Sequence, residues 1–252
     1  MRTIDLNADV GESFGAWTMG RDAELIPLLT SVNIACGFHA GDPATIAATV
    51  ALAKANGVAI GAHPGYPDLQ GFGRRVMQAS EEEVYQWVLY QAGAVRAFAQ
   101  AGGERLHHVK AHGALYNQAC VDLALSRGIV RAVKALGDNV AITVLAGSLT
   151  EQVARDAGLT VACEVFADRR YTDEGQLVSR KDPRAMITSE EESIRQVIAM
   201  VHQGRFQSVS GREISVRADT ICLHGDQPGA VAFARAVRQA LTELGITPRT
   251  YP

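Results

Sequence analysis

The first residues that could carry chemistry lie close to the N-terminus. Residues 5–12 read DLNADVGE and follow the apolar Ile4. In α/β proteins, polar residues at the C-terminal end of a buried strand usually face a ligand. Asp5, Asn7 and Asp9 alternate at period two, so their side chains point to one side of the strand. That side is either solvent or a polar site at the mouth of a sheet, and a buried first strand favours the polar site.

Ionisable residues follow most of the later strand-like segments in the same way. A lone histidine beside glycine is more often a hydrogen-bonded structural residue than a catalyst. Four histidines at equivalent positions along the chain favour a shared functional site instead. The side chains at these strand ends are His39, His63, Lys110, His112, Glu164, His224 and Asp226.

Two kinds of chemistry fit the first three strand ends. Asp9, His39 and His63 lie on consecutive strands, and one carboxylate with two imidazoles is a common ligand set for a divalent metal. The same three residues could also form a metal-free acid/base group, in which the carboxylate orients an imidazole. The sequence has no HExxH motif and no paired cysteines, so both interpretations stay open.

Cationic residues near the strand ends could bind an anion. Lys110 could stabilise developing negative charge or a phosphate, or it could be paired structurally with a carboxylate such as Glu164. Arg74 and Arg75 lie in a glycine-containing loop and form either an anion site or a solvated surface pair. There is no P-loop, no dinucleotide fingerprint and no GxSxG motif, which argues against a P-loop nucleotide site and a serine hydrolase.

The elements that must position these residues alternate between strand and helix along the whole chain, with no linker between them. This order predicts parallel strands with helical crossovers. We predict a single domain over residues 1–252, a seven-stranded, TIM-like (β/α) barrel, with a doubly wound open sheet as the alternative. The predicted strands are residues 3–6, 31–36, 58–60, 106–109, 140–145, 159–163 and 218–223. The predicted helices are residues 22–29, 44–56, 81–101, 121–136, 148–157, 190–203 and 229–244. Residues 210–212 read as a turn between two short strands.

Composition excludes several classes of protein. The 252 residues are 47% hydrophobic and 20% charged with a net charge of −3, and no basic stripe points to nucleic acid or an acidic membrane surface. No apolar run is long enough to cross a bilayer. The four cysteines are scattered and mostly lie in apolar segments, where a reduced, buried thiol is expected. We expect a soluble cytoplasmic protein without structural disulfides.

Several of these blocks together resemble the LamB/YcsF family over essentially the full chain. The matching blocks are residues 5–12, 33–42, 61–68, 71–74, 109–117, 164–169 with Tyr171, and 224–226. The resemblance implies a seven-stranded barrel related to the glycoside hydrolase/deacetylase superfamily. It also implies one subunit of a bacterial 5-oxoprolinase, which works with two further subunits, B and C. That enzyme opens the lactam of 5-oxo-L-proline to L-glutamate while ATP is cleaved to ADP and phosphate.

The residues can be assigned roles in such a reaction. Phosphorylation of the amide oxygen would create a good leaving group, which needs cationic residues for the phosphate and a base to activate water. We assign catalytic roles to Asp9, His39, His63, Lys110 and His112, and substrate contacts to Asn7, Glu12, Arg74, Glu164 and His224. A divalent cation, if present, would be held by Asp9, His39 and His63.

Two other functions remain open at this point. One is a stand-alone metal-dependent deacetylase or amidase, and the other is a non-catalytic subunit that binds substrate for its partners. ATP would bind this chain or a partner subunit.

Overall fold

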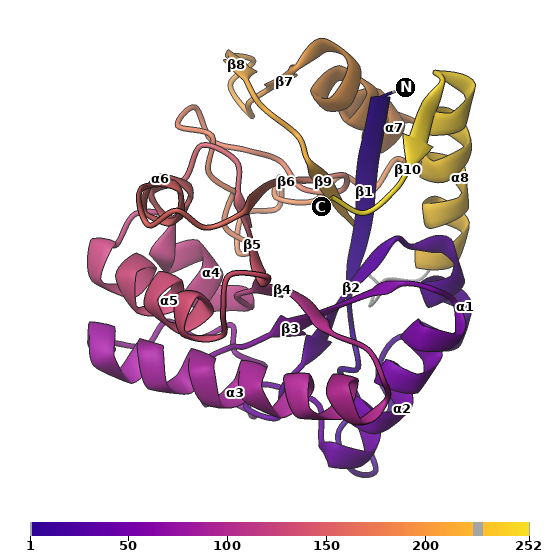
Figure 1. The fold of residues 1–252 in the computed structure, drawn as a ribbon. Helices are drawn as coiled ribbons and strands as arrows, with labels where there is room; N and C mark the ends of the chain where they lie inside the picture. Colours follow the sequence, from indigo (N-terminus) through magenta and orange to yellow (C-terminus); the bar gives the residue numbers. More distant parts are fainter. Residues whose placement is uncertain (1, 224–228, 252) are drawn as a thin grey trace.

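Seven parallel strands close into a barrel, which confirms the predicted fold. The computed structural model describes residues 2–223 and 229–251, and Figure 1 shows the arrangement. β1 pairs with both β2 and β9, so the sheet closes on itself. The barrel strands are β1 (Arg2–Val10), β2 (Ser31–Ala35), β3 (Ala59–His63), β4 (Leu106–Lys110), β5 (Ala141–Leu145), β6 (Val161–Phe166) and β9 (Thr220–Leu223).

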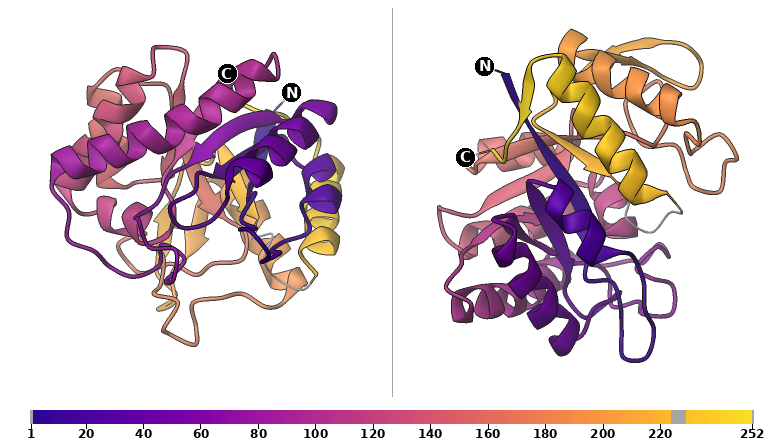
Figure 2. Two further views of the ribbon diagram at one scale, coloured as in Figure 1. Left: turned by 90° about the horizontal axis from the view of Figure 1, so that it is seen from below. Right: turned by 90° about the vertical axis from the view of Figure 1, so that its right-hand side faces the viewer.

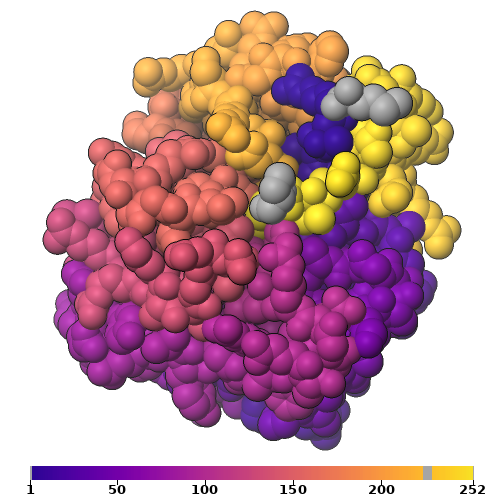
Figure 3. Space-filling model, viewed as in Figure 1, coloured from indigo at the N-terminus to yellow at the C-terminus, as the bar shows by residue number. Residues whose placement is uncertain are grey.

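Three short strands lie outside the closed barrel. β7 (Arg205–Gln207) and β8 (Glu213–Ser215) form an antiparallel hairpin around the turn predicted at residues 210–212. β10 (Ile246–Pro248) adds to the start of β1 and was not predicted, because three residues including a proline carry little strand signal. Beyond β10, the yellow C-terminal segment crosses the middle of the face shown in Figure 3.

Helices form the outer layer, as both views in Figure 2 show. Two predicted helix starts are confirmed: Asp42 caps α2 with Pro43 behind it, and Ser80 with Glu83 forms a capping box at α3. The helices are α1 (Asp22–Leu25), η1 (Ile26–Leu28), α2 (Pro43–Ala55), α3 (Glu81–Ala101), α4 (Gly113–Ala119), α5 (Leu123–Ala135), α6 (Leu149–Asp156), α7 (Glu190–Ile198), η2 (Ala199–Gln203) and α8 (Ala230–Glu243). In the part of the chain that is described, no helix combines the length and apolarity needed to span a membrane.

Several predicted boundaries were wrong in a way that matters for the site. β1 extends to Val10 instead of ending at residue 6, so Asn7 and Asp9 are strand residues. The short helix α4 was interpreted as loop. β3 and β6 both extend further than predicted, so His63 and Glu164 are strand residues rather than loop residues. The reason is that polar residues at a strand end usually mark a loop, whereas here the inside of the barrel is itself polar.

The first strand shows how the two sides of the barrel wall differ. Leu6, Ala8 and Val10 belong to the apolar core. Asp5, Asn7 and Asp9 alternate with them and make hydrogen bonds to side chains from other barrel strands, so they share one side as predicted. The barrel therefore encloses a polar interior within an apolar shell.

The lowest interior layer is built around the carboxylate of Asp5. The hydroxyls of Thr30, Ser31 and Thr220 donate to it at 2.5, 2.8 and 2.5 Å. Burial raises the pKa of Asp5 to about 6, against the lowering effect of these three donors. Asp5 is thus mostly ionised at neutral pH although it is fully buried.

One glycine makes room for this interior. A Cβ atom on Gly61 of β3 would lie 2.1 Å from Nε2 of His108 on β4, so only glycine accommodates that ring. Gly93 in α3 provides a contrast, because a Cβ atom there would have nothing within 4 Å.

We therefore expect Gly61→Ala to lower the free energy of unfolding by about 1–3 kcal/mol, the range for overpacked interiors. Gly93→Ala should leave it unchanged or raise it by up to about 1 kcal/mol, because alanine is the better helix former. Urea denaturation of both variants measures the difference. Equal stability of the two variants would show that the His108 ring is not held against Gly61.

Candidate active site

The centre of the polar interior is the ammonium group of Lys110, the last residue of β4. Its Nζ lies 3.0 Å from Oδ1 of Asp9 and 2.8 Å from Oε1 of Glu164. It also lies 3.2 Å from Sγ of Cys222. This is the arrangement of a lysine paired with neighbouring carboxylates, one of the two alternatives considered for this residue.

The charge state of this centre follows from its contacts. Burial alone would lower the pKa of Lys110, but the carboxylates of Asp9 and Glu164 outweigh it and hold that pKa well above its usual value. Burial also raises the pKa of the Cys222 thiol well above its usual range, despite the nearby ammonium group. The centre therefore holds a charged lysine beside a neutral thiol. All four cysteines are free and buried, as expected.

Two asparagines connect the carboxylates. Nδ2 of Asn33 donates to Oδ1 of Asp9 at 2.9 Å and to Oδ1 of Asn7 at 2.7 Å. Nδ2 of Asn7 in turn donates to Glu164 at 3.1 Å and to Thr220 at 2.7 Å. Because carboxylates accept and do not donate, these contacts fix the orientation of both amides.

Glu164 has a further donor that sequence reasoning missed. The hydroxyl of Tyr116 donates to Oε2 of Glu164 at 2.7 Å. Burial, followed by the Glu164 charge, raises the pKa of Tyr116 well above its usual value, so the phenol keeps its proton. Tyr116 lies on α4, the helix that was interpreted as loop, and this explains why it was not selected.

Two histidines near the mouth are held by backbone carbonyls. Nδ1 of His63 lies 2.8 Å from the carbonyl of Lys110, and Nε2 of His112 lies 2.8 Å from the carbonyl of Phe72. Each of these nitrogens must carry a proton to bond a carbonyl. The remaining nitrogens, Nε2 of His63 and Nδ1 of His112, face each other at 3.0 Å. Two neutral rings would thus bring two lone pairs together, which is unfavourable unless a proton or a cation lies between them.

A third histidine completes the group. The ring of His39 stacks on that of His112 at 3.7 Å, and neither of its nitrogens has a hydrogen-bond partner among residues 2–223 and 229–251. Burial, together with His112 and His63, lowers the pKa of His39 well below its usual value. A buried imidazole with both nitrogens unpaired calls for an explanation, and a bound ligand is one.

These histidines form a candidate cation site with Glu12. One ligand atom from each of Glu12, His39, His63 and His112 lies within 4.8 Å of the others. Metal-binding histidines usually donate their other ring N–H to a group such as a backbone carbonyl, as His63 and His112 do here. The cluster thus fits a divalent cation of the kind that prefers imidazole and carboxylate ligands.

Asp9 lies beside this cluster rather than within it. Its Oδ2 is 3.2 Å from Nε2 of His63, while its Oδ1 is occupied by Lys110 and Asn33. The cluster therefore contains Glu12 and His112 in addition to the predicted His39 and His63. The side chain of Asp9 is 16% exposed, so a molecule at the mouth can reach it.

Glycines in the surrounding loops make room for the rings. A Cβ atom on Gly65 would lie 2.7 Å from Nδ1 of His39, and one on Gly73 would lie 2.8 Å from two atoms, Cβ of His39 and Cδ2 of His112. Gly73 also has a φ of +61°, which other residues rarely adopt.

The remaining predicted residues have different surroundings. Arg75 forms an ion pair with Asp68 inside its own loop, so it stabilises that loop. Arg74 lies over the ring of Phe72 at 4.8 Å, next to His112. The predicted substrate contact His224 lies outside the described residues.

Comparisons with known proteins identify the family of this chain. Residues 4–252 match the LamB/YcsF family. A protein from Tolumonas auensis, named as the A subunit of 5-oxoprolinase, is 52% identical over 98% of each chain. The crystal structure of a lactam utilization protein from Thermus thermophilus is 51% identical, covers 99% of this chain and 100% of that one, and has a TM-score of 0.93.

Two more distant structures show the fold alone. A candidate cellobiose-phosphate cleavage protein from Enterococcus faecalis is 16% identical with a TM-score of 0.61, and covers 99% of this chain and 97% of that one. A polysaccharide deacetylase from Bacillus cereus is 14% identical with a TM-score of 0.50, and covers 100% of this chain and 93% of that one. The barrel is thus shared well beyond close relatives.

We expect the chelator-treated chain to bind one divalent cation, with Zn²⁺ as the probe in a calorimetric titration. His39→Ala should weaken that binding by at least about tenfold, the least that loss of a partner in a metal site usually costs. His202→Ala, at an exposed position, is the matched control and should bind as the wild type does. No binding by the wild type, or equal binding by His39→Ala, would exclude the cation site.

Proposed function

The chain belongs to the LamB/YcsF family, and we propose that it is the A subunit of an ATP-dependent 5-oxoprolinase. In this proposal it hydrolyses the lactam of 5-oxo-L-proline to L-glutamate together with subunits B and C, while ATP is cleaved to ADP and phosphate. The observation that carries the proposal is the 52% identity, over nearly the full length of both chains, to a protein named as the 5-oxoprolinase A subunit. The polar centre at the barrel mouth supports it, because that is where enzymes of this fold place their sites.

The site offers a base for water. Asp9 is the carboxylate of the centre that is both paired with the Lys110 ammonium group and partly exposed at the mouth. A proton taken from water would lie between its Oδ2 and Nε2 of His63, which are 3.2 Å apart. Positioned bases of this kind accelerate proton transfer by about a hundredfold to ten-thousandfold.

Lys110 then has a supporting role. It is almost completely buried and already bonded to two carboxylates, so it holds Asp9 in place and keeps it ionised. Arg74, at the rim, is the cation better placed for an anionic part of the substrate. Asn7 and Glu164 act behind Asp9 rather than on the substrate, because both are buried.

A divalent cation would be held by Glu12, His39, His63 and His112, and when bound it would supply Lewis-acid polarisation of a carbonyl oxygen. Asp9 remains available to take the proton in that case, because it lies beside the cluster. The sequence has no P-loop, so we place the nucleotide site at, or shared with, a partner subunit. Four buried, free thiols support a cytoplasmic location.

The purified chain alone should show negligible ATP-dependent release of glutamate from 5-oxoproline, and addition of subunits B and C should restore it. The reason is that the chain has the water-activating centre but no recognised nucleotide motif. Full turnover with the partners rigorously absent would contradict this. Cation-dependent turnover without ATP would instead favour the stand-alone amidase.

Asp9→Ala should lower glutamate release by the reconstituted complex about a hundredfold or more, because it removes the base. Adding His63→Ala should then cost little further, because residues that act as a unit give non-additive losses. Asp138→Ala, at an exposed position, is the matched control, and circular dichroism checks folding. Near-wild-type turnover in folded Asp9→Ala would exclude the role of Asp9, and strictly additive losses would exclude a single centre.

A further inference from the structure

We propose that the buried pair His107 and His108 carries three ring N–H protons, one more than two neutral imidazoles have. The pair thereby fixes the orientation of the Asn33 amide. Through Asn33 the pair would position the Asp9 carboxylate, a step that rests on the proposed function. Both histidines are on β4, and neither belongs to the cation cluster.

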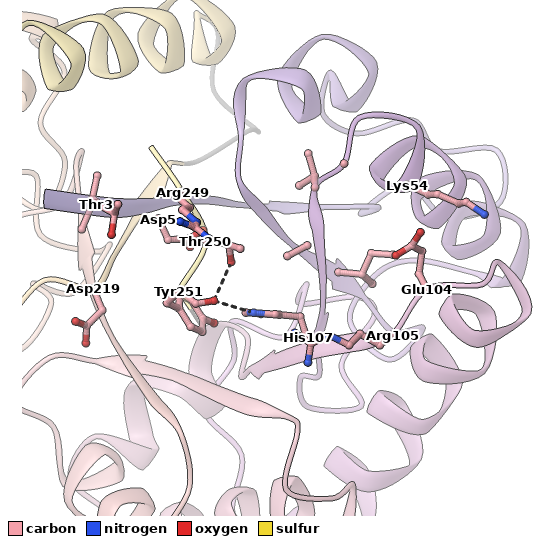
Figure 4. A pocket seen from close by; sticks show the side chains of 15 residues that line it. Thr3, Asp5, Lys54, Glu104, Arg105, His107, Asp219, Arg249, Thr250 and Tyr251 are labelled. Carbon is pink, nitrogen blue, oxygen red and sulfur yellow. Dashed lines mark hydrogen bonds between the residues drawn. The ribbon is translucent and has the colours of Figure 1, made fainter. Parts of the chain in front are cut away.

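The pair connects the bottom of the barrel to the candidate site. His107 and Tyr251 line a cleft of about 690 Å³ at the N-terminal ends of the strands, where Figure 4 shows the contact between them. Nε2 of His107 lies 3.0 Å from the carbonyl of Tyr251, and its Nδ1 lies 3.1 Å from Nδ1 of His108. Nε2 of His108 lies 2.7 Å from Oδ1 of Asn33, which contacts Asp9 through its other amide atom.

The orientation of the Asn33 amide determines whether Nε2 of His108 carries a proton. Its Nδ2 faces a carboxylate oxygen of Asp9 and Oδ1 of Asn7. The latter can only accept, because Nδ2 of Asn7 is the atom that donates to Glu164 and Thr220. The oxygen of Asn33 therefore faces His108, and Nε2 of His108 must carry a proton.

The other two contacts of the pair determine how many ring protons it needs. Nε2 of His107 faces a backbone carbonyl, which accepts only, so it must also carry a proton. The contact between the two Nδ1 atoms needs one proton as well. Three contacts thus need three N–H groups, whereas two neutral imidazoles have two. The pair is satisfied only as a singly protonated unit.

The surrounding groups act in both directions. Burial lowers the pKa of both rings, and for His108 the neighbouring His107, Lys110 and His63 add to this while Asp9 opposes it. For His107 the Tyr251 carbonyl opposes burial and Arg105 adds to it. Lys110, the ammonium group of the interior, is already paired with Asp9 and Glu164, while the buried Asp5 carboxylate accepts hydrogen bonds from hydroxyl groups. A shared proton on the pair completes three hydrogen bonds, and on this ground we assign it.

The pair would act through Asn33 as a positioning unit. Without a donor on its oxygen side, the amide of Asn33 loses one of the contacts that orient it. Its Nδ2 is one of the two donors that hold Oδ1 of Asp9, with Lys110 as the other. A shift of the carboxylate by about 1 Å can cost up to a hundredfold in rate.

The proton count can be measured directly on the whole chain. Long-range ¹⁵N–¹H spectra of histidine-labelled protein at pH 7 separate protonated from unprotonated ring nitrogens. His107→Asn and His108→Gln identify the signals of the pair. We expect three protonated nitrogens among the four. Two protonated nitrogens would mean that both rings are neutral. That result would overturn the proposal whether or not the complex is active.

The positioning role needs the reconstituted complex. His108→Leu should lower kcat for glutamate release by about tenfold or more with little change in KM, and His108→Gln, which can still donate to Asn33, should recover most of it. If His108→Leu does not fold, the smaller His108→Ala removes the same donor to Asn33 and should have the same effect. Unchanged kcat in the folded variant would overturn the positioning role. Absence of lactam turnover in the wild-type complex would instead contradict the proposed function and leave the proton count standing.

Discussion

The structure depends on one ammonium group inside a barrel. Lys110 lies between Asp9 and Glu164 at 3.0 and 2.8 Å, almost wholly removed from water. Burying such charges costs several kcal/mol each unless every remaining donor and acceptor is paired. The interior meets this condition through Asn7, Asn33 and Tyr116. A TIM-like barrel usually fills its centre with branched apolar side chains, and here the apolar shell lies outside a hydrogen-bonded interior instead.

Among the described residues, the buried side-chain nitrogens without a hydrogen-bond partner are the two ring nitrogens of His39 and Nε of Arg169. Asp5, Glu164 and the asparagines all have partners, whereas His39 has two buried ring nitrogens without one among the described residues. The contrast matters because nearly every buried polar atom in a native fold has a hydrogen-bond partner, so an unpaired one calls for an explanation. His63 and His112 point to the same conclusion, since their backbone contacts leave two nitrogens facing each other at 3.0 Å. The mouth is therefore the part of the barrel that is incomplete without a ligand.

Much of this arrangement could be predicted from the sequence. Period-two alternation placed Asp5, Asn7 and Asp9 on one side, and strand order brought Asp9, His39, His63 and His112 to one mouth. Contacts across strands could not be predicted, because they depend on register. Asn33 and Cys222 were missed for that reason, and Tyr116 was missed because its helix α4 was not predicted. All three contact the charged centre. Register is also the reason why the sequence could not indicate that Glu12 and His112, rather than Asp9, would join His39 and His63 in the candidate cation cluster.

The most direct test of the central claim is a crystal structure of the reconstituted three-subunit complex with 5-oxoproline and a non-hydrolysable ATP analogue. The claim is that lactam chemistry takes place at the mouth of this barrel. The expected result is the lactam carbonyl next to Asp9 and His63, with Lys110 still bound to Asp9 and Glu164. A lactam bound only on a partner subunit, with nothing but water at this mouth, would contradict the account.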